Sequence, residues 1–251
     1  MINIFSVVNL SEESPQKDSL AKTPEEAIQK MIELQKLGAD YVDVGARSSF
    51  SKSDELDEAV EGERLSQFFA TPRPSNLLPL SLDTWSVVNA RKYLGQLGAL
   101  NYTSTYFPDE LIDDLASTGC PLVMNYLAAD NPYALRKIPY TPPSTEAMME
   151  YFRVTVPHLE KRGVKILAID PNLGMWHPET PNELKPILQR SIIEAIPEIK
   201  KIAPVFIVAP RTNGVLNQDL VELLLSKGVD FIRTHDLTTL LDLMSRKGYI
   251  K

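Results

Sequence analysis

The chain has 251 residues, of which 43% are apolar and 24% charged, and its formal net charge is −7. This acidic balance is ordinary for a globular protein and argues against general binding to nucleic acids or acidic membranes, whose phosphates require a basic face. The chain has one cysteine, Cys120, no apolar run of about 20 residues and no basic N-terminal region, so we expect a cytoplasmic protein without disulfides, membrane spans or a secretion signal.

Short apolar segments rich in β-branched residues predict buried parallel strands, because most are too apolar to leave one face in water. We expect eight of them, at residues 3–8, 41–44, 78–82, 100–103, 121–125, 166–169, 205–209 and 231–233. Segments with helical periodicity lie between them, among them 24–37, 87–97, 145–162, 184–202 and 218–227. The first of these helices has a predicted capping box, with Thr23 as N-cap, Pro24 at the first helical position and Glu26 three residues after the cap.

A glycine marks five predicted joints between a helix and the next strand, and these are Gly38, Gly98, Gly119, Gly163 and Gly228. Glycine is favoured there because the backbone just past a helix end often turns left-handed. Eight strands alternating with helices predict a (β/α)8 TIM barrel, as a single α/β domain over residues 1–251. A doubly wound open sheet is the rival, disfavoured by the count of eight and by the lack of a Gly-rich nucleotide motif. We expect the proline-rich residues 128–144 to form a long loop within the barrel.

Polar residues follow nearly every predicted strand, at the end of a barrel where active sites lie. They are Asn9, Ser48, Ser49, Asp83, Asn101, Asn125, Asp170, Arg211, Arg233 and His235. Any one of them could simply cap a helix, but together they predict a cup with a polar floor. Arg233 and His235 are two residues apart and therefore point to one side of a strand, which favours an anion site over a merely packed histidine.

The residue types in this cup limit the classes of reaction that it could catalyse. The three histidines (His158, His177 and His235) form neither a His-x-His pair nor an HExxH motif, which disfavours a transition-metal hydrolase. No lysine lies at a predicted strand end on the cup side, since Lys165 is at the opposite end of its strand, which disfavours Schiff-base chemistry. Carboxylates and amides suit a hydrogen-bonding heterocycle, and Arg233 with His235 suits an anion.

Six short motifs, in this order, resemble the dihydropteroate synthase family of pterin-binding barrels over almost the whole chain. They are Phe5-Ser-Val-Val-Asn9-Leu-Ser, Asp43-Val-Gly45-Ala-Arg-Ser-Ser49, Ser81-Leu-Asp83-Thr84, Leu100-Asn101, Ile169-Asp170-Pro171-Asn-Leu-Gly174 and Phe231-Ile-Arg233-Thr-His235-Asp236. Each is similar to a strand-end motif of the family. The resemblance implies a TIM barrel that binds a pterin.

The resemblance also implies a transferase that joins 6-hydroxymethyl-7,8-dihydropterin diphosphate to p-aminobenzoate or a related arylamine and releases pyrophosphate, in folate or methanopterin-type biosynthesis. The implied pterin-binding residues are Asp83, Asn101, Asp170 and Arg233. Asn9, Arg233 and His235 would be catalytic at the diphosphate, with Asn9 also holding Mg²⁺. The positions implied for the second substrate or for a lid are Ser48, Ser49, Phe50, Arg211, Thr212 and Asn213. Loops 10–23 and 46–61 would be mobile lids, and a homodimer is the assembly we expect if the protein self-associates.

Two departures from the family's pattern concern positive charges. Thr212 stands where the family has a pterin-contacting lysine, and Phe50 stands where it has an arginine. Arg47 and Arg211 are the candidates to replace a lost cation. A pterin-binding module without synthase activity, or a methyl-transfer protein, is therefore the alternative function. Retention of Asn9, Arg233 and His235, which serve a diphosphate, favours the synthase.

Overall fold

The computed structural model describes residues 2–50, 55–212 and 214–249, and its main sheet confirms the predicted barrel. The strands of this sheet are β1 (Asn3–Asn9), β2 (Tyr41–Gly45), β3 (Leu80–Thr84), β4 (Ala99–Tyr102), β5 (Leu122–Asn125), β6 (Ile166–Asp170), β7 (Phe206–Val208) and β10 (Phe231–Thr234). They are parallel and follow the order β6-β5-β4-β3-β2-β1-β10-β7. A bridge between Ile169 and Val205, with the Ile169 N–H donating to the Pro204 carbonyl (2.8 Å), closes the barrel between β6 and β7.

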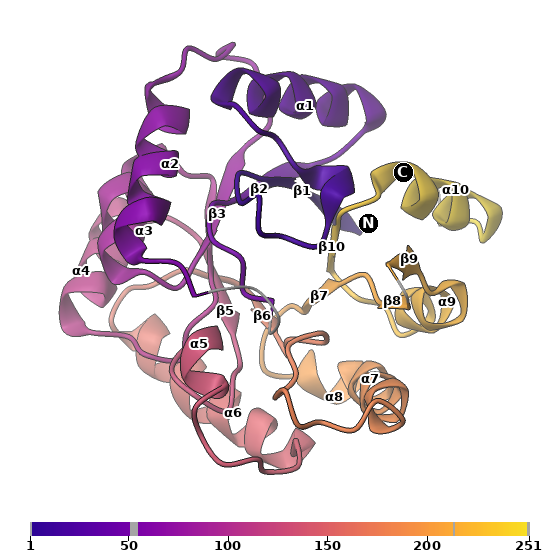
Figure 1. The fold of residues 1–251 in the computed structure, drawn as a ribbon. Helices are drawn as coiled ribbons and strands as arrows, with labels where there is room; N and C mark the ends of the chain where they lie inside the picture. Colours follow the sequence, from indigo (N-terminus) through magenta and orange to yellow (C-terminus); the bar gives the residue numbers. More distant parts are fainter. Residues whose placement is uncertain (1, 51–54, 213, 250–251) are drawn as a thin grey trace.

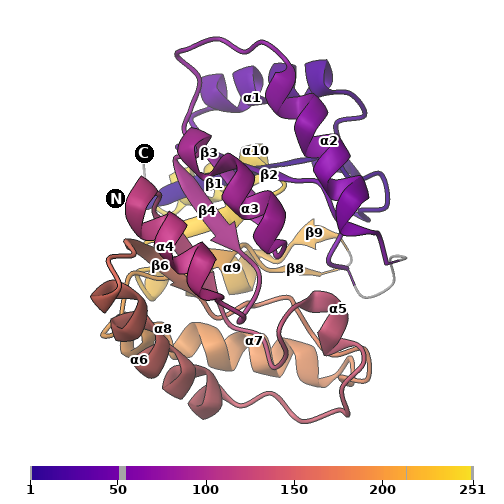
Figure 2. The same cartoon turned by 90° about the vertical axis from the view of Figure 1, so that its left-hand side faces the viewer.

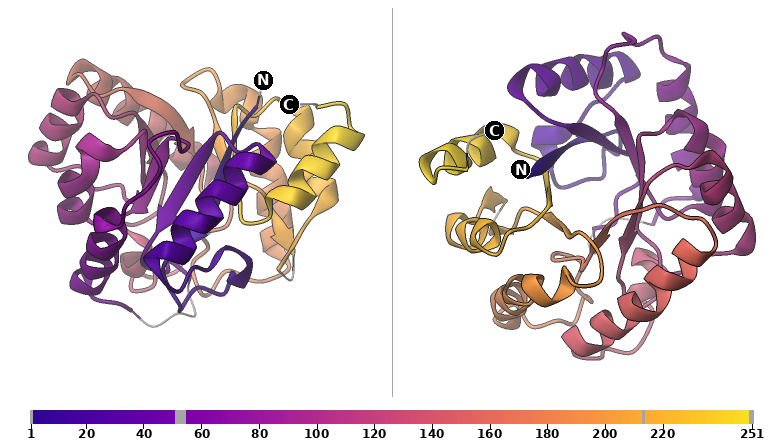
Figure 3. Two further views of the ribbon diagram at one scale, coloured as in Figure 1. Left: turned by 90° about the horizontal axis from the view of Figure 1, so that it is seen from above. Right: turned by 180° about the vertical axis from the view of Figure 1, so that it is seen from behind.

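Helices surround the strands, as Figures 1, 2 and 3 show. They are α1 (Pro24–Leu37), α2 (Glu58–Ala70), α3 (Val87–Tyr93), α4 (Asp109–Thr118), α5 (Pro132–Leu135), α6 (Thr145–Lys161), α7 (Leu184–Glu194), α8 (Ile196–Ile199), α9 (Gln218–Ser226) and α10 (Leu237–Arg246). Helix α1 begins as predicted, because Thr23 Oγ1 accepts a hydrogen bond from the Glu26 N–H (3.2 Å). None of the described helices combines the length and the apolar character that crossing a membrane requires.

Several element boundaries differ from the sequence-based expectation. The helix predicted over 184–202 is divided into α7 and α8, with Pro197 in the first turn of α8 where proline is tolerated. The helix predicted over 87–97 ends at Tyr93 and continues as a 3₁₀ turn (Leu94–Gln96). Residues 128–144 are not all loop, since Asn131 caps the short helix α5 there. Residues 46–61 include the first turn of α2, which begins at Glu58.

The joint glycines follow the prediction at four of the five positions. Their φ angles are 102° at Gly38, 65° at Gly119, 90° at Gly163 and 72° at Gly228, all left-handed. Gly98 is not left-handed. A Cβ at Gly98 would lie 2.6 Å from the Pro79 Cβ, so glycine is needed there because two segments approach closely.

The barrel interior changes character along the strands. At their amino ends Phe5, Ala99, Val123, Ala168 and Phe206 form a buried cluster, with the partly buried Tyr41 and Phe231 packed against it, separate from the larger core between sheet and helices. Side chains alternate between the two faces of a strand, so the residue two positions further along also faces inward. On five strands that next inward residue is polar: Asp43, Asn101, Asn125, Asp170 and Arg233. The interior is thus apolar at one end and polar at the other.

Candidate functional site

A cup of about 580 Å³ opens at the carboxyl ends of the strands. Its lining includes most of the predicted site residues, namely Asn9, Ser48, Ser49, Phe50, Asp83, Asn101, Asn125, Asp170, Arg233 and His235. The residues are brought together from seven strands and their loops by the closure of the barrel. This convergence of carboxylates, amides and an arginine makes the cup the candidate active site.

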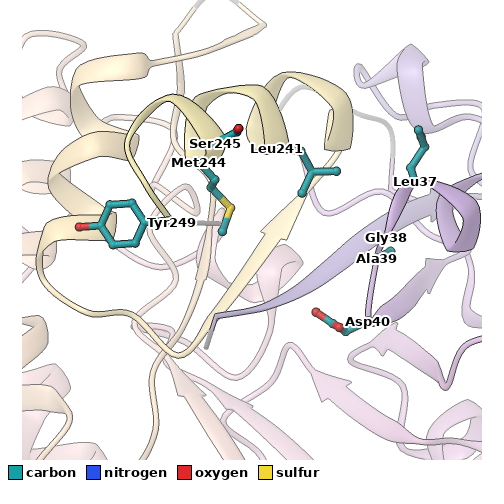
Figure 4. Close-up of a pocket in the computed structure, with 8 residues that line it drawn as sticks. All are labelled: Leu37, Gly38, Ala39, Asp40, Leu241, Met244, Ser245 and Tyr249. Atoms are coloured by element: carbon teal, nitrogen blue, oxygen red, sulfur yellow. The ribbon is translucent and has the colours of Figure 1, made fainter. Parts of the chain in front are cut away.

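A second hollow, of about 480 Å³, lies at the opposite end of the barrel between α10 and the turn from α1 to β2 (Figure 4). Its lining consists of Leu37, Gly38, Ala39, Asp40, Leu241, Met244, Ser245 and Tyr249. Asp40 is the one charged residue among these, and its carboxylate accepts a hydrogen bond from the Ile4 N–H (2.7 Å). This hollow gathers no reactive set of side chains, so we assign it no chemistry.

Hydrogen bonds between side chains connect the floor of the cup across five strands. Asn125 Nδ2 donates to Asn101 Oδ1 (2.9 Å), and Asn101 Nδ2 donates to Asp43 Oδ2 (3.0 Å). Arg233 Nε donates to the same Asp43 oxygen (2.6 Å), and Arg233 Nη2 donates to Asp83 Oδ2 (2.7 Å). This chain of bonds fixes the rotamers of the floor, and orients its polar groups before any ligand arrives.

Arg233 lies between two carboxylates instead of projecting freely into the cup. Its side chain is 15% exposed, and Asp43 on its far side is fully buried. Burial opposes the charge on Arg233, but Asp83 and Asp43 raise the pKa of its guanidinium. Burial also raises the pKa of Asp83. The positive charge of Arg233 opposes this rise, and the negative charge of Asp43 adds to it. The guanidinium therefore compensates two carboxylates of the floor, a role that the sequence did not predict for it.

Asp170 is the floor carboxyl group with the fewest protein partners. Its Oδ1 accepts a hydrogen bond from the Asn172 N–H (2.7 Å), and Oδ2 has no hydrogen-bond partner among the described residues. Burial raises the pKa of Asp170 to about 7. Asn172, with a φ of 61°, adopts the left-handed conformation that turns the chain sharply after β6. The turn leaves one oxygen of Asp170 available to a ligand in the cup.

His235 lies on the wall of the cup, but as a neutral imidazole. Its Nδ1 is 2.8 Å from Ser19 Oγ. Burial, with smaller contributions from the positive charges of Arg233 and Arg211, lowers the pKa of His235 to about 2. Without a bound anion, burial therefore favours the neutral imidazole, whereas the sequence predicted a positive charge there.

Loop 10–23 is held against the barrel at several points. Asn9 Nδ2 donates to Ser14 Oγ (2.9 Å), which leaves the side-chain oxygen Oδ1 of Asn9 beside Gly45. Arg64 of α2 forms a bidentate pair with Glu13 (2.9 and 3.0 Å). This hydrogen bonding lowers the pKa of Glu13 to about 2, against the opposing effect of burial. Ser14, Pro15 and Gln16 of this loop line the cup, and its movement as a lid stays a prediction.

The segment after β2 is held from the other side by residues of α5 and its end. Tyr133 Oη donates to the Ser48 carbonyl (3.2 Å), and Arg136 Nη2 donates to the carbonyls of Ser49 and Phe50. Phe50 is 44% exposed and stands at the mouth. These contacts place Ser48, Ser49 and Phe50 along the rim, where the sequence predicted second-substrate or lid residues.

Arg211 and Thr212, two of the predicted residues after β7, do not line the cup. Arg211 and Thr212 form β8 (Arg211–Thr212), which pairs with β9 (Val215–Leu216) in a hairpin that the sequence did not reveal. Arg211 contacts Asp18 (3.2 Å) and the Gly214 carbonyl, while the exposed Thr212 accepts a hydrogen bond from Asn217 Nδ2 (2.9 Å). Asn213 lies outside the described residues. The structure therefore places Arg211 and Thr212 outside the lining of the cup, although the positive charge of Arg211 still acts on His235.

Sequence analysis also missed several residues of the site. Asp43 begins the second of the six motifs, but the sequence analysis assigns it no binding role. Its inward position, two residues before Gly45 on β2, was the available signal. The loop after β6 contributes Met175, Trp176 and His177 to the mouth, and Lys185 of α7 lies there too, with Nζ donating to Asn182 Oδ1 (2.8 Å). The length of this loop, which follows a strand ending in Asp170, was the available signal.

Comparisons with known proteins agree with this geometry. A family model described as pterin binding enzyme matches residues 5–235. Dihydropteroate synthase type-3 of Escherichia coli is 26% identical over 261 residues, covering 96% of this chain and 97% of the relative, and the type-1 enzyme of Mycolicibacterium fortuitum is 25% identical, covering 93% and 87%. Among solved structures, the Yersinia pestis dihydropteroate synthase in a sulfonamide complex has a TM-score of 0.82 at 15% identity, covering 99% of this chain and 94% of that one. The Xanthomonas albilineans synthase with 4-aminobenzoic acid has a TM-score of 0.76 at 18% identity, covering 99% and 93%.

Proposed function

The chain belongs to the pterin-binding enzyme family, and on that premise we propose that it is a transferase of the dihydropteroate synthase type. Its substrates would be 6-hydroxymethyl-7,8-dihydropterin diphosphate and p-aminobenzoate or a related arylamine. The amine nitrogen forms a bond to the pterin methylene carbon while the bond from that carbon to the diphosphate oxygen breaks. The leaving group departs as pyrophosphate with the bonding electrons, and the amine loses one proton.

The observation that carries the proposal is the floor of the cup, where Asp83, Asn101, Asn125 and Asp170 converge. A pterin presents adjacent amino and ring N–H donors beside carbonyl and ring-nitrogen acceptors along one edge. Carboxylates accept from paired N–H groups, and side-chain amides both donate and accept. The free Oδ2 of Asp170 suits one of the donors. The buried bonds of the floor hold these groups in place, so little ordering is needed on binding.

A magnesium ion is part of this proposal, with Asn9 as its protein ligand. Among the described residues no three His, Cys, Asp or Glu side chains gather to hold a metal. The donation from Asn9 to Ser14 orients the Asn9 oxygen toward the cup, near Asp83. One oxygen ligand fits Mg²⁺, which commonly keeps several waters and takes other ligands from substrate phosphates. When bound, the ion would stabilise charge on the departing diphosphate.

The test is to incubate the protein with the pterin diphosphate, Mg²⁺ and p-aminobenzoate, and to measure both pyrophosphate and the coupled pterin–amine product. Omission of the amine distinguishes transfer from hydrolysis, and Asp170→Asn is the matched variant with a weakened floor. Formation of both products in equal amounts supports the synthase. A protein that binds pterin without forming product is the binding module kept as the alternative, and one that binds no pterin contradicts both. The homodimer stays a prediction.

A further inference from the structure

We propose that Arg47 is the cation that receives the diphosphate group of the substrate, in an anion subsite beside Asn9 and Ser48 on the β1–β2 side of the cup. The inference rests on the proposed function, because it takes the substrate to be a pterin diphosphate. It assigns to Arg47 a binding and specificity role.

Arg47 is a buried, oriented cation at the border of the cup. Its side chain is 6% exposed and lines the cup together with Asn9 and Ser48. The guanidinium lies 4.1 Å from the centroid of the Trp85 ring and 5.7 Å from that of Tyr133. Stacking on aromatic rings holds the planar group in one orientation. Its Nε is buried and has no hydrogen-bond partner among the described residues, so this donor is unused in the free protein.

The other cations around the cup are directed elsewhere. Arg233 donates to Asp43 and Asp83, and Arg136 donates to main-chain carbonyls of the rim. Arg211 belongs to the hairpin outside the cup. Lys185 lies in the first turn of α7, which follows β6, and β6 is diametrically opposite β2 in the order of the eight strands. Of the two candidates that the sequence offered for a lost cation, the structure therefore places Arg47, and not Arg211, next to Asn9.

Glu61 determines how strongly Arg47 attracts an anion. Its Oε2 lies 3.0 Å from Arg47 Nη2, and the carboxyl group is fully buried. Its Oε1 accepts from Thr84 Oγ1 (2.5 Å), whose oxygen accepts from the Ser86 N–H (3.0 Å). In the free protein Glu61 compensates the charge of Arg47. A diphosphate, with more charge and more oxygen acceptors, competes with Glu61 for the same guanidinium.

The test is calorimetric titration of the full-length protein with inorganic pyrophosphate and, separately, with 6-hydroxymethylpterin, both in Mg²⁺. The double variant Arg47→Gln/Glu61→Gln removes the ion pair without leaving a buried unpaired carboxylate. We expect it to lose about tenfold or more in pyrophosphate affinity, the scale of one charged hydrogen bond, with pterin affinity changed less than about twofold. Glu61→Gln alone should raise pyrophosphate affinity by about threefold or more, because the competing carboxylate is removed. Arg246→Gln, which removes an equal charge from the exposed end of α10, should change neither.

Three results would overturn the assignment: pyrophosphate affinity within about twofold of wild type in the double variant, an equal loss in Arg246→Gln, or no pyrophosphate binding by the wild-type protein. If the double variant does not fold, Glu61→Gln decides, and the absence of a gain contradicts the role of Arg47. A wild-type protein that binds pyrophosphate through Arg47 but binds no pterin retains the anion subsite and refutes the proposed function. The two failures are therefore distinguishable.

Discussion

The two ends of the barrel interior are formed by the same strands, but one end is apolar and the other is polar. At the amino end Phe5 stacks on Tyr41 (4.2 Å between centroids) and packs edge-on against Phe206 (5.0 Å). Two residues further along β2 and β10, the inward side chains are Asp43 and Arg233, which are joined by a hydrogen bond of 2.6 Å. Aromatic rings fill space without needing partners, whereas buried charges must be compensated. The amino end therefore contributes stability, and the carboxyl end keeps costly polar groups because a ligand uses them.

Arg233 compensates two carboxylates at the carboxyl end, so its removal should have the largest effect. Arg233→Met leaves Asp43 and Asp83 without their shared cation, which we expect to lower the free energy of unfolding by about 3–5 kcal/mol. We also expect affinity for a neutral pterin to fall at least as much as affinity for pyrophosphate, in contrast to the sequence-based assignment of Arg233 to the diphosphate. Urea unfolding and calorimetry measure the two effects.

Asp43→Asn added to Arg233→Met is the control, since it removes one of the unpaired charges and should recover part of the lost stability. A loss below about 1 kcal/mol in the single variant would mean that the two carboxylates do not need the arginine.

The next largest effect separates binding from stability at the carboxyl end. Asp170→Asn should weaken pterin binding by about 2–4 kcal/mol, because an acceptor is replaced by an amide that can turn a donor toward a donor. The free energy of unfolding at neutral pH should not fall, since the carboxylate is already disfavoured by burial. Asp219→Asn, which alters an exposed carboxylate on α9, is the matched control for calorimetry. Wild-type pterin affinity in Asp170→Asn would exclude Asp170 from the pterin site.

The pKa of the same carboxyl group also predicts how stability and pterin affinity depend on pH. Burial raises the pKa of Asp170 from an ordinary 3.8 to about 7. Between these values the folded state holds a proton that the unfolded state has lost, so the contribution of Asp170 makes stability fall as pH rises through this window. Pterin affinity should rise as pH increases through about 7, because the carboxylate is the form that accepts two N–H bonds. Asp170→Asn should abolish both dependences; a pterin affinity profile unchanged in the variant would assign the titration to another group.

At the amino end of the barrel, a substitution should lower the free energy of unfolding and leave pterin affinity nearly unchanged, and the effect should be smaller. Phe5→Leu removes a fully buried ring with its three aromatic contacts and should cost about 1–3 kcal/mol in the free energy of unfolding. Pterin affinity of the folded variant should change less than about twofold, because Phe5 lies below the floor of the cup. A loss of pterin affinity larger than the loss of stability would show that the two ends are not independent.

The smallest effect is expected outside the cup. Thr212→Lys restores the lysine that the family's pattern has after the seventh strand, but Thr212 is exposed on the hairpin, where it bonds to Asn217. Pterin affinity should therefore change by less than about 0.5 kcal/mol, the usual range of a surface substitution. A gain of about 1–2 kcal/mol, as one new charged hydrogen bond would give, would show that the hairpin reaches the ligand in the bound state.

Local physics allowed the sequence to determine the barrel and much of the cup. Buried strands are continuous in apolar residues, and each predicted strand lies within two residues of an observed one at either end. The capping box at Thr23 and the left-handed glycine at Gly38 follow from interactions within a few residues along the chain. Asp83, Asn101 and Asp170 could be placed in one site because the carboxyl ends of parallel strands meet at one end of a barrel.

What the tertiary structure decided depends on side chains that are far apart in the sequence. That Arg233 is bound between Asp43 and Asp83, 190 and 150 residues away, depends on the register of β10 and β2 with their neighbours. The neutrality of His235 follows from its burial, and the separation of Arg211 from the cup follows from a hairpin held by Asp18. Strand periodicity determines which way a side chain points, but not which side chain of another strand it contacts there. The partner determines charge, and only the closed barrel brings the partners together.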